Sequence, residues 1–242
     1  LLNTIVDNRE QSQRTLGQQF HAMNRTLRIV RITFTGEDPL MNDFVWLGLI
    51  LDFICTGFCN TDAINHVRRK SGCQFDMIPL ALRPFVNDWV IYNLHTYSKG
   101  NIFGEIKDVE IENLVQEARD KKDKFFLLFM HHNLFLTGSP WLDIHITKNR
   151  SLILKKISTL KNIRLVINGH IHQETINTYN DISFISSPST SFQFTSNEKK
   201  FKLDSINPGY LVITLKENGA WHVSCQRVAG EFGTPEVNPK TY

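Results

Sequence analysis

Two apolar runs that end in histidines constrain the fold of this chain more than any other feature. They are "FFLLFM" (125–130) and "IRLVIN" (163–168), and neither alternates between polar and apolar residues. Continuous apolar runs of this length are typical of strands that a sheet buries on both faces. Between them, "NRSLILKKISTLKN" (149–162) has the spacing of an amphipathic helix. The segment therefore predicts a strand, a helix and a second buried strand.

The other periodic segments extend this pattern in both directions. Strands are predicted at 27–34 and 88–97, a helix at 108–124, and either one buried strand or two merged elements at 44–55. After residue 180 the chain predicts antiparallel strands, with Asn218-Gly219 as the turn of a hairpin. Alternating strands and helices followed by consecutive strands indicate a two-sheet α/β sandwich.

The length of 242 residues suits one large domain that buries a sizeable core. We expect a polar N-terminal arm over 1–26, the domain over 27–230 and a C-terminal tail over 231–242.

Composition excludes several partners. The net charge is only +3 and the basic stretches are short, which disfavours nucleic acid. No apolar run is long enough to span a membrane, and the opening "LLNTIVDN" is too short for a signal peptide. Four cysteines are too sparse for a disulfide framework, so we expect a reducing, cytoplasmic location. The oligomeric state stays open.

Histidines follow both buried strands. His131 and His132 come after the first, and His170 and His172 come after the second. Ligands of open α/β sheets bind beyond the carboxyl ends of the strands, and imidazole is a common ligand of transition metals. If the chain is extended there, His170 and His172 point the same way. On this pattern alone, a metal site and ordinary hydrogen-bonded histidines are about equally favoured.

Longer motifs decide between these interpretations. "GHIH" (169–172) together with "MHHN" (130–133) resembles the calcineurin-like metallophosphoesterases. Three further segments resemble the bacterial class III cyclic-AMP phosphodiesterases of that superfamily: Trp141 to Asn149, Pro188 to Phe194, and Phe201 to Gly209. The resemblance covers about residues 89–227.

The resemblance implies a metallophosphoesterase fold that hydrolyses 3′,5′-cyclic AMP to 5′-AMP. It implies a divalent transition metal (iron, manganese or zinc), with two ions per chain in the family. The matching positions make His131, His170 and His172 metal ligands, and place His132, His145 and Asn149 near the substrate. For Asn149, a role at the start of the helix is an equal alternative.

The front third of the sequence departs from the family, whose carboxylate ligands lie there. Phe34 and Gly36 stand where an aspartate and a histidine are expected. The preferred alignment puts Cys59 in the position of the family's general-acid histidine and Asn60 in that of the following ligand. An equally plausible alignment makes "DFICTG" (52–57) the strand before the family's missing Gly-Asp motif, and a third retains only Asp52. Under every alignment at least two of the family's three N-terminal motifs are absent.

The same region is short. Only "TGEDPLMND" (35–43) separates the first strand from the next apolar run, whereas parallel neighbours need a crossover of about a dozen residues. We therefore expect that one N-terminal strand-helix unit is missing. From that expectation we predict that the chain binds at most one metal ion, and weakly. We also predict that it hydrolyses cyclic AMP at or near the background rate. Three functions remain: a cyclic-nucleotide phosphodiesterase, an impaired or inactive descendant of one, and another metallophosphoesterase.

Overall fold

The computed structural model describes residues 28–35, 45–49, 85–86, 88–190 and 192–231, the first three segments by their backbone alone. The predicted arm, nearly all of the predicted tail, and the candidate residues Cys59 and Asn60 lie outside these ranges. The proposed domain boundaries and the roles proposed for Cys59 and Asn60 therefore stay predictions.

The larger sheet has six strands in the order β3-β4-β5-β6-β8-β7. Its strands are β3 (Phe85–Val86), β4 (Trp89–Asn93), β5 (Phe125–Met130), β6 (Ile163–Asn168), β7 (Thr175–Tyr179) and β8 (Ile182–Ser186). The four inner strands β4, β5, β6 and β8 are parallel, and β3 and β7 are antiparallel edges. The two runs that are followed by histidines are thus adjacent, parallel strands of one mixed sheet, and they are buried as their composition predicted.

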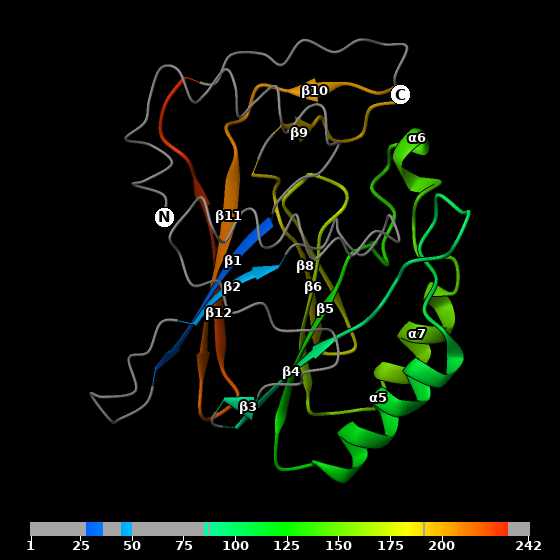
Figure 1. Cartoon of the computed structure of the whole chain (residues 1–242), viewed down its shortest axis with the longest axis vertical. Helices are drawn as coiled ribbons and strands as arrows, with labels where there is room; N and C mark the ends of the chain where they lie inside the picture. Colours follow the sequence, from blue (N-terminus) through cyan, green and yellow to red (C-terminus); the bar gives the residue numbers. More distant parts are fainter. Residues whose placement is uncertain (1–27, 36–44, 50–84, 87, 191, 232–242) are drawn as a thin grey trace, which may run out of the picture.

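Helices α5 (Asp108–Asp120) and α7 (Arg150–Ile157) cover one face of this sheet, and the short α6 (Pro140–Asp143) lies near its carboxyl edge (Figure 1). α5 begins with Asp108 and Glu110 and has Arg119 in its last turn, which complements the helix dipole. Its buried side chains repeat at helical spacing: Ile111, Leu114, Val115 and Ala118. Val109, in the first turn, is by contrast exposed.

A second sheet packs on the opposite face. Its order is β12-β11-β1-β2, formed by β12 (Trp221–Arg227), β11 (Gly209–Lys216), β1 (Arg28–Thr35) and β2 (Val45–Leu49). The predicted hairpin joins β11 to β12, and Gly219 has the positive φ of 77° that its turn requires. β9 (Gln193–Phe194) and β10 (Leu203–Asp204) form a separate two-stranded ribbon.

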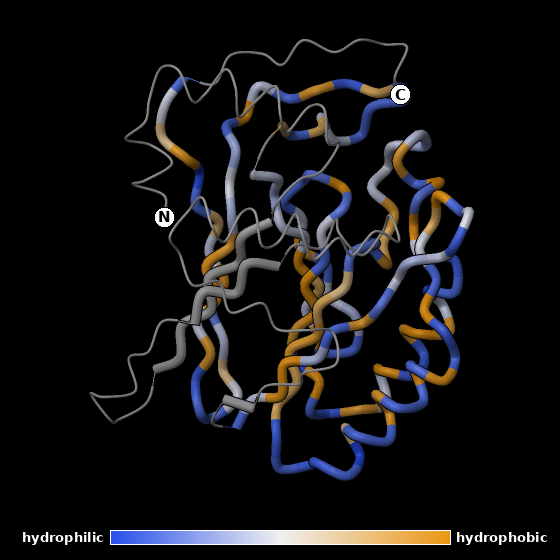
Figure 2. The backbone as a smooth tube through the Cα atoms, viewed as in Figure 1, coloured by the Kyte–Doolittle hydropathy of each residue, from blue (hydrophilic) through white to orange (hydrophobic). Residues whose placement is uncertain are grey.

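Strand β5 explains why its sequence does not alternate. Phe126, Leu128 and Met130 pack into the core under α5 and α7. Leu127 and Phe129 pack into the other core, against Leu211, Ile213 and Leu215 of β11. Both faces of the strand are dry, and Figure 2 shows hydrophobic residues concentrated along these central strands. The prediction of a two-sheet α/β sandwich is confirmed.

One argument for a missing N-terminal unit does not hold. β2 pairs with β1 in the antiparallel sense, and antiparallel neighbours need only a short connection. A segment as short as 35–43 can therefore connect β1 directly to β2. Whether a strand-helix unit is absent depends on residues 50–84, which lie outside the described ranges.

None of the helices in the described ranges has the length and apolar character needed to cross a bilayer.

Candidate metal centre

The carboxyl ends of β5 and β6 meet because these strands are parallel neighbours, with Met130 opposite Asn168. Their continuations stay in contact: the Gly169 amide donates to the His131 carbonyl over 3.1 Å. The sheet thus brings together two histidine segments that are about forty residues apart in the sequence. This edge is where ligands of α/β sheets bind.

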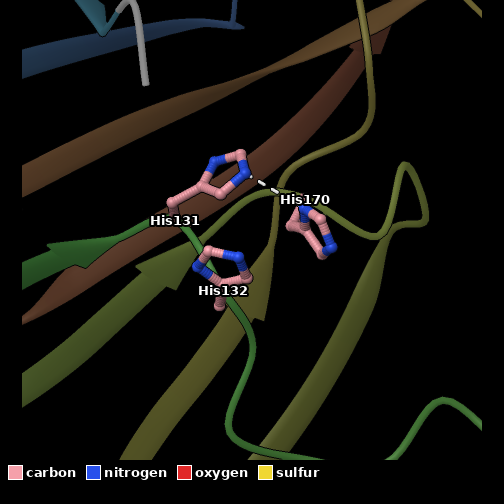
Figure 3. Close-up of side chains that lie close together, drawn as sticks. All are labelled: His131, His132 and His170. Atoms are coloured by element: carbon pink, nitrogen blue, oxygen red, sulfur yellow. Dashed lines mark hydrogen bonds between the residues drawn. The ribbon is translucent and has the colours of Figure 1, made fainter. Parts of the chain in front are cut away.

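Three imidazoles converge at this edge (Figure 3): His131, His132 and His170, each with one ligand nitrogen within 4.8 Å of the others. The closest pair, His131 Nε2 and His170 Nδ1, lies 3.0 Å apart. His131 and His132 are buried and His170 is partly buried. We call this group the histidine cluster.

The short contact restricts protonation. A hydrogen bond between His131 Nε2 and His170 Nδ1 needs one nitrogen to donate and the other to accept, whereas both nitrogens of an imidazolium are donors. Two imidazolium rings at this distance would also repel each other in a partly desolvated place. The arrangement therefore favours at least one neutral ring, which is the form that binds metals.

The backbone at His170 is a tight turn rather than a strand. The Ile171 amide donates to the Gly169 carbonyl over 2.7 Å, and His170 between them has φ of 65°. This is a three-residue turn of the uncommon positive-φ kind, a strained conformation for a residue with a Cβ. His172 also has positive φ, 50°. The extended conformation assumed from the sequence, in which His170 and His172 point the same way, is therefore wrong.

His172 lies apart from the histidine cluster. Its Nδ1 is 3.0 Å from the Phe192 carbonyl, and its ring stacks on Phe194 at 4.5 Å between centroids. The ligand group found among the described residues does not include it. The hydrogen bond to a carbonyl fixes the ring and its tautomer, as outer contacts of metal-binding histidines commonly do. Its predicted role as a ligand stays a prediction.

His132 is held in place by the loop that follows β4. Thr96 Oγ1 lies 2.8 Å from His132 Nδ1. Gly104 packs against the ring so closely that a Cβ there would lie 2.5 Å from it. Neither Thr96 nor Gly104 was identified from the sequence, because each belongs to a loop segment without a motif. Since Nδ1 faces Thr96, Nε2 is the nitrogen through which His132 would bind a ligand.

His145 lies beside the cluster, with its ring centroid 5.2 Å from that of His170. Its Nδ1 is 3.1 Å from the Ile102 carbonyl. Burial lowers the pKa of His145 below its usual value of 6.5, and the hydrogen bond to Ile102 opposes this only in part. The ring is therefore predominantly neutral near pH 7. His145 and Asn149 both follow α6 and were both predicted to lie near the substrate; His145 is the one whose ring lies beside the histidine cluster.

Asn149 has a different set of contacts. Its Oδ1 accepts from the Ile106 amide over 3.2 Å and its Nδ2 donates to the Ile106 carbonyl over 2.6 Å. It occupies the N-cap position of α7 without a side-chain capping bond. Its amide therefore ties the segment before α5 to the start of α7. A contact with substrate stays a prediction.

The donor set of the histidine cluster suits a single metal ion. Ligand nitrogens on one zinc lie at most about 4.2 Å apart, because each bond is about 2.1 Å long. The 3.0 Å pair already meets this limit, and all three ligand nitrogens lie within 4.8 Å of one another, close to it. No carboxylate belongs to the group within the part of the chain that the structure describes. Three imidazole nitrogens, with no bridging oxygen ligand among the described residues, fit one ion better than two.

Comparison with known proteins places this geometry in context. No protein-family model matches the chain. The 3′,5′-cyclic adenosine monophosphate phosphodiesterase CpdA of Escherichia coli (strain K12) is 28% identical over 173 residues, which is 71% of this chain and 63% of the relative. A protein named as a probable cyclic nucleotide phosphodiesterase from Psychrobacter sp. (strain PRwf-1) is 31% identical over 149 residues, 60% of this chain and 44% of the relative.

A solved structure also resembles this fold. A dimetal phosphatase from Danio rerio matches with a TM-score of 0.41 and 9% identity, over 67% of this chain and 88% of that one. That likeness is too weak to bear on function.

The sequence relationships are stronger: these relatives are named as established or probable cyclic nucleotide phosphodiesterases. More particularly, the chain is a homologue of bacterial proteins named as cyclic-AMP phosphodiesterases, which confirms the resemblance found in its motifs. It spans about half the length of these relatives, from 44% to 63%.

Proposed function

We propose that this chain is a calcineurin-like metallophosphoesterase of the cyclic-nucleotide type, whose reaction is hydrolysis of a 3′,5′-cyclic nucleotide to the 5′-monophosphate. The observation that carries the proposal is the histidine cluster at the carboxyl ends of β5 and β6. Homology to cyclic nucleotide phosphodiesterases supports the substrate class. The proposal includes a domain over 27–230 and a cytoplasmic location, which the sparse cysteines support.

In this proposal His131, His132 and His170 hold a divalent transition metal, with His172 as a further ligand. Imidazole donors suit zinc and iron, whereas manganese prefers oxygen ligands, so the order of preference is zinc or iron before manganese. A bound ion of this kind supplies Lewis-acid polarisation of a phosphoryl oxygen and activates water at neutral pH.

The chain itself orients the reacting groups. Thr96 and Gly104 fix the His132 ring, and the turn at His170 aims that side chain at His131. His145, next to His170, is placed to contact the substrate in its neutral form. Asn149 holds the 101–107 loop against α7, and that loop carries the Ile102 carbonyl that positions His145.

A second candidate function is an impaired descendant that keeps the scaffold and binds one metal without efficient turnover. The observation that favours it is the all-imidazole composition of the cluster in the described residues. A two-metal centre needs hard oxygen ligands that offset the charge, and the front motifs that supply them in the family are degenerate here. Under this reading, hydrolysis of cyclic AMP stays at or near background.

One experiment separates the two. Cyclic-AMP hydrolysis is measured with zinc, iron(II) or manganese added to the purified chain, to His170→Ala and to His222→Ala, an exposed histidine of β12 that serves as the matched control. Turnover that His170→Ala abolishes and His222→Ala retains supports the active enzyme. Metal binding by the cluster with background turnover supports the impaired form. Absence of both turnover and metal binding would refute each reading.

A further inference from the structure

Strand β7 is an edge of the larger sheet, and within the described ranges no strand pairs with its outer side. Its five residues pair with β8 in unbroken antiparallel register, from Thr175 opposite Ser186 to Tyr179 opposite Ile182. The outer backbone N–H and C=O groups of an edge strand can pair with a further strand. At the opposite edge of the same sheet, β3 has only two residues.

The sequence of β7 has none of the features that commonly protect an edge from association. "TINTY" contains no charged residue and no proline, and its pairing with β8 has no bulge. Ile176 is 70% exposed and Tyr179 is 38% exposed, so two large side chains with apolar surface lie along this edge. A regular, uncharged edge of this kind favours addition of a strand from another chain.

Three side chains of β7 share one face of the sheet. Asn177 pairs with Phe184, which belongs to the core under α5 and α7. Because side chains alternate along a strand, Thr175 and Tyr179 lie on the same face as Asn177. All three therefore lie on the face of the sheet that the helices cover.

A cleft of about 180 Å³ lies at the start of β7. Its lining includes Thr175 and Asn177, together with Phe135, which packs against the core under the helices. The exposed residues that line it are both aliphatic and polar: Leu136, Ile176, Ser196 and Asn197. A mixed lining suits a tyrosine, whose ring is apolar and whose hydroxyl needs a hydrogen-bond partner. One aromatic ring fits the space, since a protein cavity of roughly 150 Å³ accommodates benzene.

Two copies of β7 are complementary to each other. In an antiparallel pair centred on Asn177, each Asn177 faces its counterpart. Ile176 then faces Thr178 of the second copy. Thr175 likewise faces Tyr179 of that copy. Aromatic and β-branched residues are favourable cross-strand neighbours, and no pair brings like charges together.

The same register connects the edge of the sheet with the cleft. Thr175 lines the cleft, and the Tyr179 that faces it would come from the second copy, on a strand about 4.8 Å away. Paired residues share a face, so this tyrosine ring would lie at the mouth of the cleft. Each copy supplies one tyrosine and one cleft, which is the self-complementary arrangement that a twofold interface requires.

We propose that this chain forms a dimer by antiparallel pairing of β7 with β7 of a second copy, in which Tyr179 of each copy occupies the cleft of the other. The larger sheets of the two copies then form one continuous sheet. The histidine cluster takes no part in this pairing, so the dimer is independent of the proposed function.

Analytical ultracentrifugation of the whole chain over a range of concentrations would measure this association, with chelator present so that metal ions cannot bridge two copies. A dimer in equilibrium with monomer is expected. Tyr179→Ala should raise the dissociation constant of the dimer about tenfold, because both tyrosine contacts are lost, and Tyr179→Phe should stay near the parent value. Ile176→Lys should also weaken the dimer, whereas Ile206→Lys, at an isoleucine that is 50% exposed and lies outside β7, should not.

Asn177 gives the sharpest test because it lies on the twofold axis. Asn177→Lys or Asn177→Asp alone puts like charges opposite each other, so each variant should be monomeric at concentrations at which the parent chain is a dimer. A mixture of the two variants puts opposite charges there and should restore a dimer with one copy of each. Loss of folding in either variant would not produce this restoration.

The proposal is overturned if the parent chain is monomeric at every concentration, or if it forms a closed assembly of an odd number of copies. Dimerisation of Asn177→Lys with the affinity of the parent chain would overturn it as well. A mixture of Asn177→Lys and Asn177→Asp that stays monomeric would show that these residues do not face each other, with the same consequence.

Discussion

Replacement of His170 by alanine should remove most of the metal affinity of this chain. Its ring is in contact with both other members of the histidine cluster, at 4.8 Å from His131 and 4.6 Å from His132 between ring centroids. It is also the partner in the 3.0 Å nitrogen pair that best matches the spacing of ligands on one ion. The substitution thus takes away the ligand that links the two neighbouring histidines.

The size of the loss follows from the number of ligands. Structural zinc sites with four protein ligands bind with about 10–16 kcal/mol, or about 3 kcal/mol for each ligand. Loss of one ligand should therefore weaken binding by about 100-fold, at 1.4 kcal/mol for each factor of ten. The parent affinity should itself fall between about pH 7 and pH 5, because protonated imidazoles do not bind metal.

Calorimetric titration with Zn²⁺ and the visible spectrum of the Co²⁺ form would measure both quantities. His222→Ala is the control, since this exposed histidine of β12 lies outside the cluster. Thermal unfolding of the metal-free proteins would show that His170→Ala keeps its fold. Equal zinc affinity in His170→Ala and the parent would refute the assignment of the cluster. Two tightly held ions per chain after dialysis would refute the single-ion stoichiometry.

Three further results are expected. Asn149→Leu removes two hydrogen bonds to Ile106, so it should lower the free energy of unfolding by about 2 kcal/mol and the melting temperature by about 4–8 °C. Asn101→Leu, at an exposed asparagine, should change the melting temperature little. Leu127→Ala, at a residue with 0% exposure between the two sheets, should cost about 3 kcal/mol in urea unfolding, and no measurable cost would contradict the packing described. Burial lowers the pKa of His145 in the folded state, so the stability that its neutral ring contributes is present above about pH 6.5 and declines as the pH falls toward this lowered pKa. His145→Gln should flatten that part of the plot of stability against pH. An unchanged plot would show that the ring titrates normally.

Much of the fold follows from residue patterns that depend on neighbours along the chain. Buried strands such as β5 are recognisable because a strand covered on both faces contains no polar positions, and helix α5 because its apolar residues recur at a period of 3.6. The turn at Asn218-Gly219 follows from the tolerance of these residues for positive φ. The sequence also indicated that His131 and His170 would approach each other, since both follow parallel strands.

Other features depend on contacts between distant segments. The sequence contained no sign that β2 runs antiparallel to β1, because strand direction is set by pairing rather than by composition. Likewise, no local pattern marks Thr96 and Gly104 as the residues that hold His132, since they act through a loop from another part of the chain.

The two histidines of the "GHIH" motif illustrate the difference between what the sequence determines and what the tertiary structure decides. Their spacing determined that imidazoles would stand at the end of β6, and the chemistry of imidazole determined that a metal could be held there. Which of them faces His131 was decided by the turn at His170, whose positive φ rotates it toward the cluster while His172 stacks on Phe194. A strained backbone of this kind persists only where surrounding packing and hydrogen bonds hold it, so only the tertiary structure could select it.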